Sequence, residues 1–390
     1  MMKLQGTVVT PDGVRANTVV TVVDDRITEV RPAGTSDSDA SHHAWILPGF
    51  VDLHNHGGAG FGFPNADRAG CRAAARHHRA HGTTTLLASL VSAPGEQLVE
   101  QTALLADLAD EGEIDGVHME GPFINHCRCG AQDPAAIIPG DPALFAKVAR
   151  AGRGWLKSIT FAPETDHAFE LLEVCAEHGV VASLGHTDAD FDVTLSVLER
   201  AERLGVPVTA THLFNAMPPV HHRAPGAAAA MIDAAATGRM VVELVADGVH
   251  LHDRTVDLVW DAVHPASATF VTDAMAAAGT ADGDYVLGDL RVTVASGVAR
   301  LTTTDGSLGA IAGGTSRLLD QVQRHLRRGR DVAEVAALAA TTGARVLGLS
   351  DRGSIAVGNR ADVVCLGTDL ELEQVLWRGA QLPAAARERS

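Results

Sequence analysis

The chain has 390 residues, of which 46% are hydrophobic and only 4% are aromatic, so we expect a large core built from Ala, Val and Leu. Its formal net charge of −17 argues against nucleic acid as a partner, because a nucleic-acid backbone is bound by clustered Lys and Arg. The five cysteines show no disulfide spacing, which predicts a reducing compartment. There is no apolar signal region at the N-terminus and no apolar run of about 18 residues. We therefore expect a cytoplasmic protein without a membrane span.

Both ends of the chain read as short strands. β-Branched runs separated by turn residues occupy residues 1–47, and similar runs return after residue 350. We expect residues 1–47 and 350–390 to build one small β-sandwich domain.

The segment between them, residues 48–349, alternates short apolar runs with helical patterns. The eight strand-like runs are residues 50–56, 83–90, 114–120, 156–162, 180–186, 207–213, 240–247 and 269–273. Helical patterns cover residues 67–81, 95–109, 143–151, 167–178, 190–204, 316–328 and 332–347. Eight strand–helix repeats predict an α/β fold, a (β/α)8 TIM barrel, with a β-hairpin insertion near residues 283–302. A doubly wound open sheet is the alternative, but the G-x-G-x-x-G spacing is missing after the first strand.

Metal-ligand residue types stand at the ends of six of the eight predicted strands. They are His54 and His56, Glu120, His186, His212, His250 with Asp247, and Asp273. Active sites of TIM barrels lie at these carboxyl ends, and side chains at i and i+2 of a strand share one face. Cys127 and Cys129 lie in one loop without a second Cys pair, so we expect them to be incidental loop thiols.

These residues predict a hydrolytic site that holds one or two divalent metal ions. Nitrogen and oxygen ligands without thiolate suit zinc, which we prefer, or iron, manganese or cobalt. We expect one ion among His54, His56, Glu120 and Asp273. A second ion is expected among Glu120, His186 and His212, with Glu120 bridging the two. A metal lowers the pKa of a water molecule that it holds to about 7, and Asp273 is the candidate catalytic residue that accepts the proton.

Five motifs carry a resemblance to a known family. They are residues 52–56 (DLHNH), 118–123 (HMEGPF), 185–187 (GHT), 211–217 (THLFNAM) and 272–275 (TDAM). Together they resemble the N-acetylglucosamine-6-phosphate deacetylases of the amidohydrolase superfamily, over nearly the whole chain. The resemblance implies the same barrel and sandwich, a homodimer, and hydrolysis of the acetamide of N-acetyl-D-glucosamine 6-phosphate. It also implies a place in amino-sugar catabolism and cell-wall recycling.

The resemblance further implies a set of substrate-binding residues. Asn215 and Ala216 would bind near the sugar phosphate, Arg223 and His250 would hold the phosphate, and Ile311 would lie in a loop that contacts substrate. In the loop of residues 120–134, Ala131 and Gln132 would face the substrate. Gln132 departs from the family, which places a histidine there near the acetyl carbonyl.

Two kinds of alternative stay open. Within the superfamily, the chain would be a deacetylase of N-acetylgalactosamine 6-phosphate or a cyclic-amide hydrolase. From another class, a non-enzymatic assembly protein on the same fold ranks low, because such proteins usually lose their ligands and all are present here.

Overall fold

The computed structural model describes residues 1–35, 37–303 and 307–383. The chain divides into two compact units. The first contains residues 1–52, residues 77–85 and the chain from residue 317 onward, and the second contains residues 53–76 and 86–316. Each unit is described by itself.

The terminal unit is organised by one seven-stranded sheet, in the order β21-β20-β19-β4-β1-β2-β3. Its strands are β1 (Met2–Thr10), β2 (Gly13–Val23), β3 (Arg26–Pro32), β4 (Ser41–Pro48), β19 (Val363–Leu366), β20 (Leu372–Trp377) and β21 (Ala380–Gln381). The two ends of the chain meet where β19 pairs antiparallel with β4, with Cys365 opposite Ile46. Buried Val8, Val20 and Val363 belong to the core of this unit. Both chain ends therefore share one sheet, whereas the bounds of the expected β-sandwich domain, residues 1–47 and 350–390, stay a prediction.

Three short helices also belong to the terminal unit. They are α8 (Leu318–Arg327), α9 (Val332–Ala336) and α10 (Thr342–Val346). The second expected helix, residues 332–347, is present as α9 and α10 joined by a π-helical turn, Ala337–Thr341. No helix within the described ranges is long and apolar enough to cross a membrane.

The barrel sheet contains all eight strands that the apolar runs predict. The strands are β5 (Phe50–Asn55), β8 (Thr83–Leu90), β9 (Gly116–Glu120), β10 (Leu156–Phe161), β11 (Val181–Leu184), β12 (Val208–Ala210), β13 (Val241–Leu244) and β14 (Ala268–Phe270). Their order is β14-β13-β12-β11-β10-β9-β8-β5, so each strand lies next to its neighbour in the chain. The pairs from β8 to β14 are parallel. All residues of these strands except Lys157 are buried, as expected for a sheet covered on both faces.

Backbone hydrogen bonds close the barrel between its first and last strands. The Asp273 N–H donates to the His54 carbonyl at 2.9 Å, and the His56 N–H donates to the Ala274 carbonyl at 2.7 Å. The segment after β14 therefore lies beside the end of β5. This closure confirms the TIM barrel and gathers the eight carboxyl ends around one rim.

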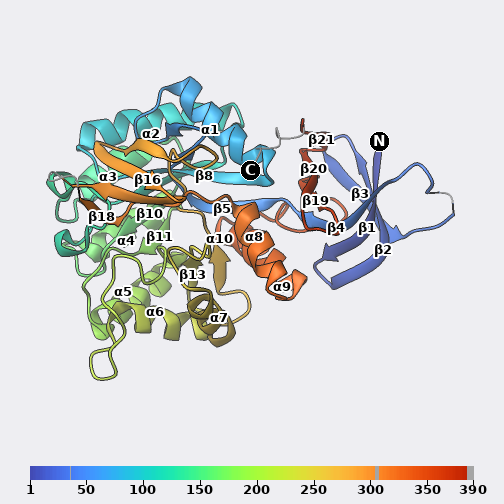
Figure 1. Cartoon of the computed structure of the whole chain (residues 1–390). Coiled ribbons are helices and arrows are strands. Elements are labelled where there is room, and N and C mark those ends of the chain that lie inside the picture. Colours follow the sequence, from blue (N-terminus) through green and yellow to red (C-terminus); the bar gives the residue numbers. More distant parts are fainter. Residues whose placement is uncertain (36, 304–306, 384–390) are drawn as a thin grey trace. The chain divides into compact units, whose positions relative to one another are not determined.

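Helices follow the strands; α1 to α5 match predicted patterns, whereas α6 and α7 were not predicted. They are α1 (Arg68–Ala80), α2 (Gly95–Asp110), α3 (Pro142–Ala151), α4 (Ala168–His178), α5 (Phe191–Leu204), α6 (Gly226–Ala236) and α7 (Asp253–Ala262). Helices α2 to α7 lie along the outside of the strands (Figure 1). Local sequence sets their ends: the Asp190 side chain accepts from the Val193 N–H to begin α5, and Gly205 at φ 69° ends it.

The expected insertion near residues 283–302 is a four-stranded antiparallel sheet. Its strands, in order, are β15 (Gly283–Leu287), β16 (Leu290–Ala295), β17 (Val298–Thr302) and β18 (Leu308–Ile311). Leu287 and Val292 pack in one cluster with Val91 and Met275 of the barrel unit. A two-stranded ribbon, β6 (Gly57–Gly58) with β7 (Phe61–Gly62), directly follows His56.

Candidate active site

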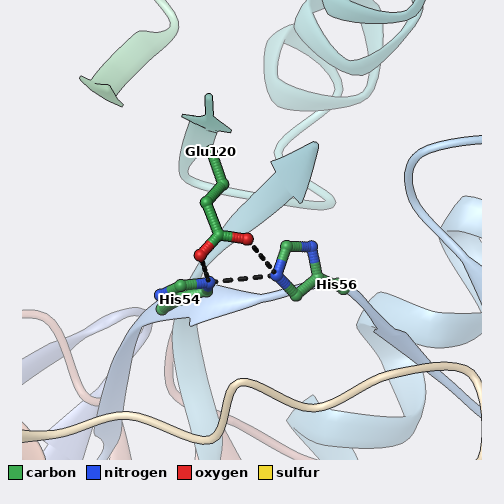
Figure 2. A group of neighbouring side chains, drawn as sticks. All are labelled: His54, His56 and Glu120. Atoms are coloured by element: carbon green, nitrogen blue, oxygen red, sulfur yellow. Dashed lines mark hydrogen bonds and ion pairs between the residues drawn. The ribbon is translucent and has the colours of Figure 1, made fainter. Parts of the chain in front are cut away.

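The end of β5 delivers two imidazoles to one point. His54 and His56 alternate with Asn55, so both rings lie on the same side of the strand, and both are buried. Their Nε2 atoms are 3.0 Å apart. Glu120, the last residue of β9, reaches the same point (Figure 2). Its Oε1 lies 3.5 Å from His54 Nε2, and its Oε2 lies 3.2 Å from His56 Nε2.

A second pair of imidazoles meets the other side of Glu120. His186 and His212 follow β11 and β12, and their Nε2 atoms are 3.1 Å apart. Glu120 Oε1 lies 3.1 Å from the first of these atoms and 2.9 Å from the second. Glu120 therefore lies between two histidine pairs, as the sequence predicts for a bridging carboxylate.

Both groups fit a metal ion. In each group the ligand atoms lie within 4.8 Å of one another. Two nitrogen ligands of a tetrahedral zinc ion are roughly 3.3 Å apart, because each stands about 2.0–2.1 Å from the metal. The two Nε2–Nε2 separations, 3.0 and 3.1 Å, are close to that value. Imidazole and carboxylate donors without thiolate are suited to Zn²⁺ and related divalent ions.

Asp273 joins the first pair from the end of the last strand. Its Oδ1 lies 3.4 Å from His54 Nε2 and 3.2 Å from His56 Nε2. Burial opposes the charged form of Asp273, but the surrounding imidazoles outweigh it and hold the pKa of this carboxyl below its ordinary value. Burial likewise opposes the charge on Glu120, and the His54 charge with hydrogen bonds from the second pair holds its pKa well below the usual range. Two ionised carboxylates thus face one small buried space, which suits a cation.

Three of these residues have unusual backbone conformations. His186, His212 and Asp273 have φ values of 48°, 26° and 48°, in the left-handed region that non-glycine residues rarely occupy. Each residue held in such a conformation costs about 1–3 kcal/mol of folding free energy, and such residues concentrate at functional sites. Each stands within three residues of the end of its strand, where the chain turns sharply at the rim.

His250 is held next to the site by its own loop. Its Nδ1 lies 2.9 Å from Asp247 Oδ2, and Asp247 Oδ1 accepts from the Val249 and His250 backbone N–H groups. Burial alone would lower the pKa of His250, but the hydrogen bond and charge of Asp247 raise it overall. His250 Nε2 is 3.8 Å from Asp273 Oδ2, so this imidazole borders the candidate catalytic carboxylate.

The loop after β9 brings Gln132 to the site. The Gln132 amide is buried, and its Nε2 donates to Glu120 Oε2 at 2.5 Å. Gly130, two residues before it, lies against the His186 ring, because a Cβ there would stand 3.4 Å from His186 Cε1. The half-buried Ala131 packs on the cluster under the insertion. The loop therefore lines the site, although Gln132 contacts a ligand-type residue in this structure.

The remaining predicted substrate-binding residues lie in three other segments of the chain. Asn215 and Ala216 come three and four residues after His212, and the Ala216 carbonyl accepts from the Thr187 N–H. Ile311 ends β18, and three residues later the Gly314 N–H donates to the Asp273 carbonyl at 2.6 Å. Arg223 is exposed in the turn of residues 221–224, so the structure does not bring it to the ligand group.

Comparison with known proteins places the chain in a family. Residues 45–382 match the amidohydrolase family. The chain belongs to the amidohydrolase family. It is 34% identical to the N-acetylglucosamine-6-phosphate deacetylase of Bacillus subtilis (strain 168), across 95% of this chain and 94% of that protein. It is 31% identical to the same enzyme of Homo sapiens, across 86% of this chain and 82% of that protein.

Solved structures of this branch of the amidohydrolases show the same fold. The N-acetyl-D-glucosamine-6-phosphate deacetylase of Mycobacterium smegmatis is 35% identical, with a TM-score of 0.90, covering 98% of this chain and 100% of that chain. A mutant of that enzyme in complex with N-acetyl-D-glucosamine-6-phosphate is 36% identical, with a TM-score of 0.89, covering 97% and 98%. The Thermotoga maritima enzyme is 31% identical, with a TM-score of 0.85, covering 97% and 99%.

One residue of this amidohydrolase site was missed in the sequence. Glu243 lies in the middle of β13, is 3% exposed, and stands 3.4 Å from His54 Nδ1 through its Oε2. We read only the ends of the strands, so a carboxylate inside one was overlooked. The available signal was an acidic residue in an otherwise apolar run, Val241-Val242-Glu243-Leu244, which must find a buried partner.

Proposed function

We propose that this amidohydrolase hydrolyses the acetamide of N-acetyl-D-glucosamine 6-phosphate to D-glucosamine 6-phosphate and acetate. The observation that carries the proposal is the meeting of four imidazoles and two carboxylates at one point of the barrel rim. Relatives named for this activity match nearly the whole chain, and a mutant of one of them has been solved in complex with the sugar phosphate. The reaction belongs to amino-sugar catabolism and cell-wall recycling.

The proposed metal content is one or two divalent ions per subunit, with zinc preferred over iron, manganese or cobalt. His54, His56, Glu120 and Asp273 would hold one ion, and Glu120, His186 and His212 the other. Both ligand-type groups carry buried nitrogen and oxygen donors. When bound there, a divalent ion polarises the acetyl carbonyl and makes water a nucleophile at neutral pH.

The chain's own groups move the proton. In our proposal a carboxylate oxygen of Asp273 takes the proton lost by the attacking water and passes it to the departing amine nitrogen. His250, placed by Asp247, lies 3.8 Å from that carboxylate and can keep its orientation. Gln132 offers a neutral hydrogen-bond donor where the family has a histidine.

The phosphate would be held at the edge of the site. Arg223 is exposed and suits this role, because its planar guanidinium donates two parallel hydrogen bonds to phosphate oxygens. His250 would supply the second cation. Ala131, Asn215, Ala216 and Ile311 would contact the sugar, and a cytoplasmic homodimer would close the site.

Acetate release from matched substrates tests the proposal. Zinc-loaded protein is assayed with N-acetylglucosamine 6-phosphate, with its galactosamine epimer and with unphosphorylated N-acetylglucosamine. We expect the first to give the highest kcat/KM and the unphosphorylated sugar the lowest. Preference for the epimer would favour the galactosamine alternative. Absence of acetate from every substrate, in protein that holds metal, would overturn the proposal.

A further inference from the structure

A layer of buried polar side chains lies inside the barrel, one step below the ligand-type residues. Within the described ranges, Glu243 is the one carboxylate of this layer, and each of its oxygens has partners. Oε1 accepts from Thr209 Oγ1 at 2.9 Å and from Ser183 Oγ at 3.4 Å. Oε2 accepts from the His212 backbone N–H at 3.3 Å and lies 3.4 Å from His54 Nδ1. Glu243 thus touches one member of each histidine pair.

The Oε1 side continues as a series of hydrogen bonds through Ser183. Its hydroxyl lies 2.6 Å from Thr211 Oγ1, which lies 2.8 Å from Thr160 Oγ1. Thr160 Oγ1 lies 2.8 Å from His118 Nε2. His118 Nδ1 lies 2.9 Å from Ser89 Oγ, and that oxygen accepts from the Asn55 N–H at 2.9 Å. The series therefore begins at Asn55, between His54 and His56, and ends at Glu243.

A carboxylate at the end of this series favours one direction for its hydrogens. A carboxylate only accepts, and a hydroxyl has one hydrogen to donate. Thr209 Oγ1 donates to Glu243 and also lies 2.7 Å from Ser183 Oγ. In the arrangement in which Ser183 donates to Glu243, Ser183 accepts from Thr211, which in turn accepts from Thr160. Thr160 then accepts from the Nε2–H of His118. His118 Nδ1 is then free to accept from Ser89, whose oxygen takes the Asn55 N–H. Hydrogen bonds aligned in one direction strengthen one another.

The contact between Glu243 Oε2 and His54 Nδ1 fixes the tautomer of His54, a ligand-type residue. Because the carboxylate cannot donate, the contact with His54 requires the hydrogen on Nδ1. The lone pair of His54 is then on Nε2, the atom that lies 3.4 Å from Asp273 Oδ1 and 3.0 Å from His56 Nε2. Metal-binding histidines are oriented in this way by a carboxylate on the other ring nitrogen.

We propose that Glu243 is a positioning residue of the metal centre: it holds His54 in the Nδ1–H tautomer and polarises the interior hydrogen-bond series that ends on it. The inference rests on the proposed metal site. It assigns to this chain an outer carboxylate for the His54/His56 group, whereas the His186/His212 group receives only a backbone contact from the same residue.

Three variants of the full-length protein separate this role from general packing. E243L removes the acceptor, E243Q keeps the shape and one acceptor oxygen, and T211V breaks the series without touching Glu243. T102V is the matched control, because Thr102 Oγ1 in α2 is also buried and has no hydrogen-bond partner. Zinc affinity is measured by competition with a chelator, and the Co²⁺-loaded proteins are compared by visible absorption.

We expect E243L to bind the ion of the His54/His56 group about 10-fold to 100-fold more weakly. This is the usual loss of metal affinity when a ligand loses its outer hydrogen-bond partner. E243Q should lose less than E243L, T211V should shift the Co²⁺ spectrum, and T102V should match the parent. If E243L does not fold, the zinc affinity and the Co²⁺ absorption spectrum of E243Q and T211V test the inference. Parental zinc affinity and an unchanged Co²⁺ spectrum in the folded Glu243 variants would overturn the inference. A parent protein that binds no metal would instead overturn the proposed function.

Discussion

Gln132 and Glu120 form a buried hydrogen bond of 2.5 Å between an amide nitrogen and a carboxylate oxygen. The orientation of the amide is fixed, because its Oε1 accepts from the Ser92 backbone N–H at 2.6 Å. The carboxylate that lies between the two histidine pairs therefore has a neutral donor on its outer side. The resemblance places Gln132 where the family has a histidine near the acetyl carbonyl, and it does not indicate this contact with Glu120.

Replacing Gln132 tests the importance of this bond. Q132A should lower kcat/KM or metal affinity by about 10-fold to 100-fold, because Glu120 loses an outer partner. Q132E should be worse than Q132A, since it sets a second carboxylate against Glu120. Steady-state kinetics and metal content of both variants check this order. Equal behaviour of Q132E and the parent would contradict it.

The two histidines of β5 can be removed together. H54A/H56A should lose one metal ion per subunit, because these residues supply both imidazoles of the first group and none of the second. Metal content by elemental analysis gives the answer. H77A/H78A, in α1 and outside both groups, is a matched pair of histidine substitutions and should keep the full content. Loss of all metal from H54A/H56A would show that the groups do not bind independently.

Arg223 is proposed to act on the phosphate and not on the chemistry. R223A should raise KM for N-acetylglucosamine 6-phosphate by about 10-fold to 100-fold, since losing a charged hydrogen bond costs about 1.5–3 kcal/mol. Its kcat should change little. R203A, which removes another exposed arginine from α5, is the control. An unchanged KM in R223A would remove Arg223 from the phosphate site.

Thiol labelling should sort the cysteines by exposure. Cys127 is exposed, whereas Cys71, Cys175 and Cys365 are buried. Burial raises the pKa of Cys71 to about 12 and raises those of Cys175 and Cys365 further. A raised thiol pKa means that almost no thiolate is present at pH 8, so these three should resist iodoacetamide until the protein unfolds. Peptide mass spectrometry would contradict this if Cys175 were labelled as fast as Cys127.

The barrel could be predicted because each strand is a short apolar run, and all eight runs became strands. The ligand-type residues could be predicted because parallel strands bring their carboxyl ends to one rim, which unites His54 with Asp273 across more than half the chain. The partners of Glu243 could not be foreseen. They depend on which side chains face inward from three other strands, β5, β11 and β12, and no local pattern fixes that register.

The contacts of loop residues could be predicted less well from the sequence, because no periodic pattern determines the conformation of a loop. The Gln132 contact depends on the conformation of a loop that contains two short 3₁₀ turns, His126–Arg128 and Pro134–Ala136. Such turns follow from individual side-chain caps, here Asn125 and Asp133, and not from a periodic pattern. Arg223 stays a prediction, because the structure leaves it exposed.

The central claim is that Asp273 carries the proton in a metal-dependent deacetylation. The most direct measurement is the rate of acetate release from N-acetylglucosamine 6-phosphate by D273N, with D192N, an exposed aspartate of α5, as the control. Metal content is determined in the same samples. The account predicts that D273N keeps its metal and loses about 100-fold to 10,000-fold in kcat, the range for a lost general acid–base group. D273N that holds metal and turns over at nearly the parental kcat would contradict it.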